Sequence, residues 1–230
     1  MNELEEIRAR YVRRINLDLG LYSPITPAVF MSQQELERGL ISWIKYAGLL
    51  PVSDRRVLEV GCGVGGNLLQ LIKLGFSPEN LVGNELLEER AFKARSRLPA
   101  TTQIIYGDAC KLDLPTGSFD VVLQATVFSS ILDDVFQNIL ADRMWALTKP
   151  GGGILWYDFI CNNPRNQDVK GVPVKRIKEF FPNGNLVVRK ITLAPPISRL
   201  VTKIHPCLYT LLNLFPFLRT HLLCWIQKPL

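Results

Sequence analysis

Short apolar runs alternate with amphipathic stretches between residues 56 and 160, and this alternation constrains the fold more than any other feature. Runs of this kind favour buried strands, and the stretches between them carry apolar residues at helical spacing. Strands connected through helices form a parallel sheet that is covered on both faces, so the sequence predicts a doubly wound α/β fold. The predicted strands are Val57–Val60, Leu81–Asn84, Gln103–Tyr106, Val121–Gln124 and Gly153–Tyr157, and the predicted helices are Asn67–Leu74, Glu88–Arg97 and Val135–Leu147.

The first 50 residues are predicted to form a helical arm or lid before this core. Apolar residues recur there at helical spacing, and Ser32 with Glu35 has the pattern of a capping box at a helix start. The core itself is expected to span residues 51–160.

Residues 161–230 are expected to complete the sheet and to cover the substrate. A polar loop follows Asp158, and two late strands are predicted at Leu186–Leu193 and His221–Lys228. The apolar segment between these two strands indicates a lobe inserted before the last strand. We therefore expect a single domain with an arm, a core and a C-terminal lobe.

A glycine-rich turn follows the first predicted strand, in the sequence Val57-Leu-Glu-Val-Gly-Cys-Gly-Val-Gly-Gly. Glycines are needed where a chain turns sharply from strand to helix and a ligand approaches the backbone N–H groups. Gly61, Gly63 and Gly66 also satisfy the G-x-G-x-x-G spacing of dinucleotide sites, so a nicotinamide or flavin enzyme stays possible at this point. The turn predicts a nucleotide site without identifying the nucleotide.

Three carboxylates near the predicted strands narrow this choice. Glu85, after the second strand, could accept hydrogen bonds from both ribose hydroxyls, or could be a solvated carboxylate at a helix start. Glu59, inside the first strand, needs a ligand ammonium or backbone donors if it is buried. Asp108 could accept from the amine of adenine, with room left by the small Ala109, or could cap its own turn. Binding of a pyrophosphate requires none of these.

Taken together, these elements resemble the class I S-adenosylmethionine-dependent methyltransferases. The resemblance spans roughly residues 50–160, with five elements in the family's order. They are Val57–Gly66, Glu85, Gly107-Asp-Ala, Phe119-Asp-Val-Val and Leu147-Thr-Lys-Pro-Gly-Gly. The resemblance implies a Rossmann-like, mostly parallel sheet of seven strands with an antiparallel last strand, which agrees with the two late strands. It also implies S-adenosylmethionine as the cofactor.

The resemblance further implies where that cofactor lies. Its amino-acid part is expected near Glu59 and Gly61, its ribose on Glu85, its adenine by Asp108, and its methionine side beside Gln124. The implied cofactor-binding residues are Glu59, Gly61, Cys62, Gly63, Gly65, Glu85, Leu86, Asp108, Ala109 and Gln124. The five scattered cysteines lack metal-ligand spacing, so we expect no metal site and a reducing, cytoplasmic location.

Catalytic residues are harder to assign, because methyl transfer from a sulfonium depends chiefly on proximity and orientation. A base is needed only when a hydroxyl must lose its proton. Asp158, expected just past the fifth strand, is the first candidate for this base, and an ion pair with Arg165 is the alternative. His205 in the apolar lobe is the second candidate. Asp120 is expected to hold the turn that precedes its strand.

Short strings outside the core are similar to methyltransferases of bacterial polysaccharide and glycolipid pathways. They are Tyr157-Asp-Phe, Asn162-Asn-Pro-Arg-Asn with Lys170-Gly-Val, and Leu218-Arg-Thr-His-Leu-Leu. This similarity implies a small-molecule or glycoconjugate acceptor that is methylated at oxygen. Two alternatives stay open, a non-catalytic cofactor-binding or partner module of the same fold and a nicotinamide-dependent oxidoreductase.

The chain carries a formal net charge of +6, with 27 basic and 21 acidic residues. No basic run interleaved with aromatic residues is present, and Gln124-Ala-Thr-Val-Phe is unlike the Asn-Pro-Pro-Tyr type of sequence that grips a planar amine, so we expect no nucleic-acid partner. The charge instead favours an anionic acceptor, such as a phosphate-linked sugar, or an anionic membrane surface.

Residues 197–218 carry apolar side chains together with Arg199 and Lys203. This segment could make weak peripheral contact with the inner face of a membrane. The favoured interpretation is an internal lid that buries its apolar face on the core, because Pro206 and Pro216 break any long helix.

Overall fold

The structure is a computed structural model that describes residues 3–15, 23–162 and 166–230. Its centre is a seven-stranded sheet of order β3-β2-β1-β4-β5-β7-β6, in which β7 alone runs antiparallel to both of its neighbours. The predicted fold class is confirmed. The strands are β1 (Val57–Val60), β2 (Leu81–Glu85), β3 (Gln103–Tyr106), β4 (Phe119–Ala125), β5 (Thr148–Phe159), β6 (Asn185–Leu193) and β7 (Arg219–Gln227).

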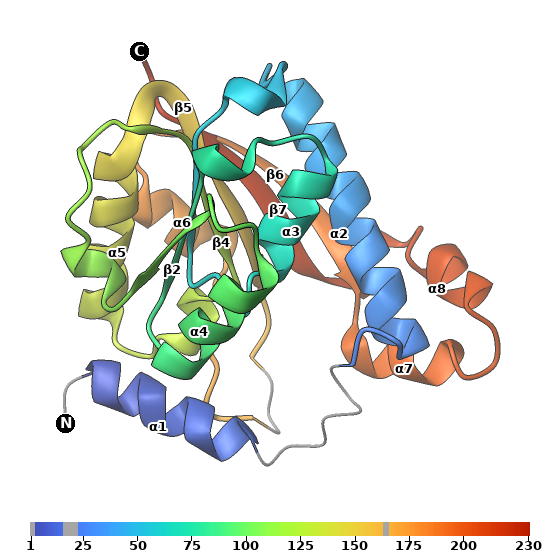
Figure 1. Ribbon diagram of the computed structural model, residues 1–230. Helices are drawn as coiled ribbons and strands as arrows, with labels where there is room; N and C mark the ends of the chain where they lie inside the picture. Colours follow the sequence, from blue (N-terminus) through green and yellow to red (C-terminus); the bar gives the residue numbers. More distant parts are fainter. Residues whose placement is uncertain (1–2, 16–22, 163–165) are drawn as a thin grey trace.

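Helices cover both faces of the sheet (Figure 1). On one face lie α2 (Pro27–Tyr46), α3 (Gly66–Lys73) and α4 (Glu88–Arg97), and on the other lie α5 (Asp134–Leu147) and α6 (Val174–Phe180). The strands contribute apolar side chains to both layers, as a parallel sheet buried on two sides requires. Trp43 of α2 and Met144 of α5 are among the fully buried side chains of the two layers.

The capping box predicted at Ser32 and Glu35 is wrong. Helix α2 begins at Pro27, after Thr26, because a proline at the first helical position has its backbone already arranged for a helix. Ser32 lies inside the helix, where its hydroxyl donates to the carbonyl of Val29. Glu35 is buried and bonds to the C-terminal part of the chain, as described below.

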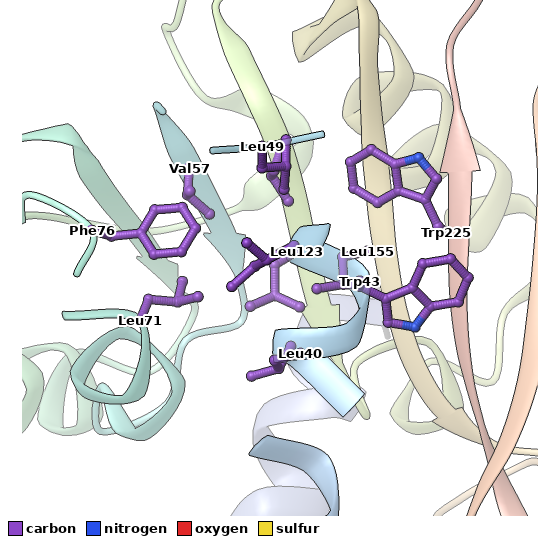
Figure 2. A pocket seen from close by; sticks show the side chains of 11 residues that line it. Leu40, Trp43, Leu49, Val57, Leu71, Phe76, Leu123, Leu155 and Trp225 are labelled. Carbon is purple, nitrogen blue, oxygen red and sulfur yellow. The ribbon is translucent and has the colours of Figure 1, made fainter. Parts of the chain in front are cut away.

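A small apolar cavity of about 20 Å³ lies between α2 and the sheet. Figure 2 shows that Trp43 and Trp225 line one side of it and Phe76 and Leu71 the other. A space of this size and lining is a packing gap rather than a ligand site. It also lies beside Val57, the first residue of β1, whereas ligands of such sheets bind outside the carboxyl ends of the strands.

The C-terminal lobe, residues 195–218, contains α7 (Pro195–Val201), α8 (Cys207–Leu212) and a 3₁₀ turn at Pro216–Leu218. It is inserted between β6 and β7, as predicted. Phe159 pairs with His221 and Leu193 pairs with Arg219, so the lobe leaves the sheet at the end where β5 finishes. The lobe is therefore attached at the edge formed by the carboxyl ends of the parallel strands. Across the described ranges, every helix is too short or too polar to cross a bilayer.

Candidate functional site

The glycine turn after β1 has the geometry expected of a close ligand approach. Gly61, Gly63 and Gly65 have φ values of 67°, 60° and 81°, in the left-handed region that favours glycine. A Cβ on Gly61 would lie 2.5 Å from a methyl carbon of Val127, and a Cβ on Gly63 would lie 2.6 Å from a guanidinium nitrogen of Arg90. The turn therefore forms a narrow cradle that excludes side chains at these positions.

Glu85 ends β2 and joins that strand to the turn. Its carboxylate is buried and accepts hydrogen bonds from the Gly63 N–H (2.8 Å) and the Leu87 N–H (2.9 Å). The alternative of a solvated carboxylate at a helix start is wrong. Each oxygen retains acceptor capacity beyond these single bonds, as a ribose diol would require. Leu86, the residue between Glu85 and Leu87, packs against the apolar core.

Glu59 in β1 is a buried carboxyl group with one oxygen unused. Its Oε1 accepts from the side-chain amide of Asn67 (2.6 Å), and its Oε2 has no hydrogen-bond partner among the described residues. Burial raises the pKa of Glu59 to about 8, the bond from Asn67 opposes this rise, the charge of Glu85 adds to it, and Arg90 opposes it. An unused buried oxygen beside a ligand cradle fits a ligand that carries an ammonium group.

Asp108 and Ala109 follow β3 at the same edge. The Asp108 carboxylate accepts from the Cys110 N–H (2.9 Å) and so caps the 3₁₀ turn Ala109–Lys111, which is the alternative role that the sequence left open. Asn84 of β2 donates to the carbonyl of Gly107 (2.9 Å) and fixes this segment beside Glu85. Contact of Asp108 with an adenine amine stays a prediction.

Gln124 and Cys62 are two further buried residues of the predicted set. The Gln124 side chain is fully buried, accepts from the Val127 N–H (3.0 Å) and donates to the Tyr157 carbonyl (3.4 Å). It thereby holds Val127 against the glycine turn. The Cys62 thiol is buried, and burial raises its pKa far above the ordinary value, so it is an inert small side chain.

Helix α1 (Glu3–Ile15) lies across the carboxyl edge of the sheet, at the bottom of Figure 1. Glu3 accepts from the Leu132 N–H (3.0 Å) and forms an ion pair with Arg10, and Arg10 donates to the Ser130 carbonyl (3.3 Å). These bonds attach the helix to the segment that follows β4. Of the helical arm predicted over residues 1–50, α1 covers the edge at which the cofactor residues gather, whereas α2 packs on a face of the sheet as part of the core.

Arg90 of α4 is a site residue that sequence reasoning missed. Its guanidinium rests against Gly63 and lies over the ring of Tyr11 in α1, 5.0 Å from the ring centre. Its positive charge favours the ionised form of Glu59. Arg90 therefore connects the covering helix with the turn and the buried carboxylates.

Asp158 is expected just past the fifth strand, and this placement is wrong. It lies inside β5, one residue before the end of the strand. Pairing with Leu222 of β7 extends β5 to Phe159, and this long-range pairing has no local sequence signal. The fully buried carboxylate accepts from the Ser129 N–H (3.0 Å) and the Phe159 N–H (2.9 Å). Burial raises its pKa to about 7, although these bonds lower it. The alternative partner, Arg165, lies outside the described residues, as do Asn163 and Pro164.

The remaining predicted residues lie away from this cluster or have structural partners. His205 is exposed in the lobe, and its Nδ1 accepts from the Cys207 N–H (3.2 Å), so it holds the start of α8. The role predicted for Asp120 is wrong. Instead of holding the preceding turn, it accepts from the Arg56 N–H and from Lys149, because it lies where β4 passes the starts of β1 and β5. Within the described ranges, no three side chains of metal-ligating type gather.

A family model for a methyltransferase domain matches residues 57–152, which contain the turn, Glu85 and Asp108. A sterol 24-C-methyltransferase of Neurospora crassa is 28% identical over 152 residues, which are 63% of this chain and 38% of that protein. A tRNA N(3)-cytidine methyltransferase of Bos taurus is 30% identical over 112 residues, 45% of this chain and 29% of that protein. The chain thus spans about a third of the length of these relatives.

Solved structures show the same fold at low identity. Magnesium protoporphyrin IX methyltransferase of Synechocystis PCC 6803, with bound SAH, superposes with a TM-score of 0.62 at 12% identity and covers 96% of this chain and 94% of its own. The [4+2]-cyclase SpnF also has a TM-score of 0.62, at 15% identity, over 86% of this chain and 82% of its own.

The matched domain decides between the two nucleotide classes that the glycine turn left open, against a nicotinamide-dependent oxidoreductase. S-adenosylmethionine is the cofactor of this domain, and its ammonium and ribose suit the unused oxygen of Glu59 and the buried carboxylate of Glu85. Residues 57–152 thus match a methyltransferase domain, and the sheet order and fold are those of the class I S-adenosylmethionine-dependent methyltransferases.

Proposed function

We propose that the protein transfers a methyl group from S-adenosylmethionine to an oxygen atom of a small-molecule or glycoconjugate acceptor. The observation that carries the proposal is the unused buried oxygen of Glu59 beside the glycine cradle, within a matched methyltransferase domain. When bound, the cofactor would supply a methyl group on a sulfonium, which an acceptor oxygen could take up in line with release of the demethylated cofactor.

The residues of the edge would each hold one part of the cofactor. Glu85 accepts from the ribose hydroxyls while it keeps the N–H groups of Gly63 and Leu87, so the cofactor finds this carboxylate already oriented. Glu59 meets the ammonium, and Asp108 meets the adenine amine with its remaining acceptor capacity. Such prior orientation lowers the entropic cost of binding.

Asp158 is the proposed acceptor of the proton that the attacking hydroxyl loses. It lies at the end of β5, and a pKa of about 7 is suited to a general base near neutral pH. Because its carboxylate is fully buried against Ser129, the segment at Ser129 must move for an acceptor hydroxyl to reach it. His205 is the weaker candidate, since its exposed ring already accepts from Cys207.

A polar groove beside the same loop supports an anionic acceptor. It has a volume of about 280 Å³ and is lined by three basic residues, Lys170, Lys175 and Arg176, and by Asp134 and Glu179, which pair with Lys170 and Arg176 and leave one positive charge in excess. The backbone N–H of Lys170 donates to the Ser129 carbonyl (2.8 Å), so the groove adjoins the segment that covers Asp158.

The five free cysteines support a reducing, cytoplasmic location.

Calorimetry with S-adenosylmethionine and with SAH tests the cofactor, and transfer of a labelled methyl group to glycolipid and metabolite extracts tests the activity. We expect binding of both ligands and a labelled product whose methyl group is bound to oxygen. Asp158→Asn should abolish the rise of kcat through pH 7 and leave cofactor binding unchanged. A loss of kcat that is equal at all pH values would instead assign Asp158 a positioning role.

A non-catalytic or differently catalytic member of the fold is the second candidate. The [4+2]-cyclase SpnF shares the fold with this chain, so the fold alone does not fix the reaction. Intact cofactor binding without transfer to any extract would favour this candidate.

A further inference from the structure

The C-terminal lobe has the reverse of the usual helix pattern. In and after α7, the polar side chains of Ser198 and Thr202 are buried, whereas Leu200 and Ile204 between and beyond them are exposed to solvent. A surface helix normally turns its apolar stripe toward the protein and its polar side chains toward water. The favoured interpretation of the segment as an internal lid that buries its apolar face is therefore wrong.

Buried hydrogen bonds keep the lobe in this orientation. Glu35 of α2 accepts from the Tyr209 hydroxyl (2.6 Å) and from the side-chain amide of Asn213 (2.5 Å). Tyr209 is fully buried, and Thr202 donates to the Ser198 carbonyl (2.7 Å) inside the lobe. Tyr209 and Asn213 thus bond the lobe to α2, and in this orientation Leu200 and Ile204 are held outward.

Large apolar side chains of the lobe are exposed to solvent along a short stretch of the sequence. Six of them are between 45% and 78% exposed, namely Leu200, Ile204, Leu211, Leu214, Phe215 and Phe217. Single exposed apolar residues are common on proteins, but a group of this size in one small lobe indicates a binding surface.

The charge of the lobe and of the two strands that it connects favours one kind of partner, and Arg199 and Lys203 are the basic residues of the lobe itself. Residues 180–230 contain no Asp or Glu and six basic residues, namely Arg189, Lys190, Arg199, Lys203, Arg219 and Lys228. The rest of the chain has 21 basic and 21 acidic residues, so the whole surplus of +6 lies in this region. A second copy of the chain would bring like charges together at such a surface, which is unfavourable.

We infer that the lobe, residues 195–218, docks on a bilayer that contains anionic phospholipid. Its leucine and phenylalanine side chains would enter the boundary between headgroups and acyl chains, and Arg199 and Lys203 would meet the lipid phosphates. Apolar burial and attraction to anionic lipid together give the binding strength of peripheral proteins.

The attachment point of the lobe gives the docking a direction. The lobe leaves the sheet where β5 ends, at the edge that holds the glycine turn and Asp158. Docking would therefore bring this edge near the membrane surface and favour an acceptor that is anchored in lipid. This last step rests on the proposed function, whereas the docking itself does not.

Sedimentation with sucrose-loaded vesicles tests the inference, with phosphatidylcholine alone compared with phosphatidylcholine that contains phosphatidylglycerol. We expect at least about tenfold stronger partition onto the anionic vesicles, because each basic residue near the surface contributes about fivefold. Phe215→Ser with Phe217→Ser should reduce binding by about tenfold or more, because two large apolar side chains no longer enter the lipid. Arg199→Gln with Lys203→Gln should remove most of the preference for anionic lipid.

The matched control is Val135→Ser with Ile139→Ser, which removes two exposed apolar side chains from α5, on the other face of the sheet. These changes should leave vesicle binding unaltered. Equal binding to both vesicle types, or unchanged binding of the phenylalanine variant, would overturn the inference. A concentration-dependent dimer that the phenylalanine variant abolishes, without vesicle binding, would assign the surface to a second copy. Calorimetry with SAH on the same samples separates a failure of docking from a failure of the proposed function.

Discussion

Two regions at the same end of the sheet place side chains against their usual preference, in opposite directions. Around the glycine turn, Glu59 and Glu85 are carboxylates withdrawn from water. In the C-terminal lobe, apolar side chains such as Phe217 are held in water while Ser198 and Thr202 are buried. Both arrangements are unfavourable for the isolated protein, since water prefers the opposite placement.

The two regions differ in the kind of partner that would remove the unfavourable placement of their side chains. One oxygen of Glu59 has no donor among the described residues and Glu85 keeps spare acceptor capacity, and a nucleoside with an ammonium group offers donors to both. The lobe lacks an apolar surface and negative charge, and an anionic bilayer offers both. Side chains that disobey local preference thus indicate the chemistry of the missing partner, because natural sequences violate local rules chiefly at functional sites.

The largest effect is expected at Glu85. Replacing it with alanine removes the charged acceptor for both ribose hydroxyls and releases the Gly63 N–H, so the affinity for SAH should fall by about 100-fold or more. Calorimetry measures this, and circular dichroism checks that the variant is folded. Glu88→Ala, an exposed glutamate three residues later on α4, is the matched control and should bind normally. Equal affinities for the two variants would refute the ribose assignment.

The glycine turn allows a comparison between two neighbouring glycines. Gly61→Ala places a Cβ 2.5 Å from Val127 at a φ of 67°, and should lower the free energy of unfolding by about 2 to 3 kcal/mol. Gly66→Ala meets open space in the first turn of α3, and should raise it by up to about 1 kcal/mol. Urea denaturation measures both values. Similar behaviour of the two variants would show that the cradle tolerates side chains.

The stability of the protein should report the burial of Glu59 through pH. Its pKa is raised from 4.5 to about 8 in the folded state, so the stability that the protonated acid preserves is fully present below 4.5 and is lost as the pH rises through 8. Between pH 6 and pH 8, the wild type should lose about 2 kcal/mol of unfolding free energy that Glu59→Gln does not lose. Urea denaturation at both pH values measures this difference.

Asp158 also titrates in this range, but the wild type and the Glu59 variant share it, so the difference between them isolates Glu59. Parallel pH profiles for the two proteins would mean that the Glu59 carboxyl is solvated.

The smallest effect is expected in the lobe. Leu200→Ser replaces an exposed side chain, so the free energy of unfolding should change by less than about 0.5 kcal/mol. Leu40→Ser in α2 replaces a buried leucine and serves as the reference, with an expected loss of about 3 kcal/mol or more. Thermal or urea denaturation compares them. A loss above about 1 kcal/mol for Leu200→Ser would mean that this side chain packs against the protein.

The sheet and the glycine turn could be predicted because their signals are local. Apolar runs of four or five residues mark the buried strands, and the prediction of α4 at Glu88–Arg97 matches the structure at both ends. The turn was identified from its glycines, and Glu85 from its position after the next strand. A resemblance in five ordered elements then supplied the cofactor, which local physics alone left open.

What could not be predicted depends on contacts between distant segments. The extension of β5 over Asp158 arises from pairing with β7, and the short helix α6 has few residues to show a period. Arg90 belongs to a helix rich in charged side chains, so its sequence position carried no special signal. Apolar spacing in the lobe indicated which side chains share a face, but it could not show whether that face points inward.

Strand β7 lies between β5 and β6, although it is the last strand in the sequence. Among the described strands, β6 pairs with β7 alone, so residues 185–193 have no strand partner until residues 219–227 have been synthesised. During translation, β5 and β6 therefore both present open edges, and such edges promote association between chains. The sheet is therefore completed in one late step. Because the lobe connects β6 to β7, it affects the yield of folding as well as binding.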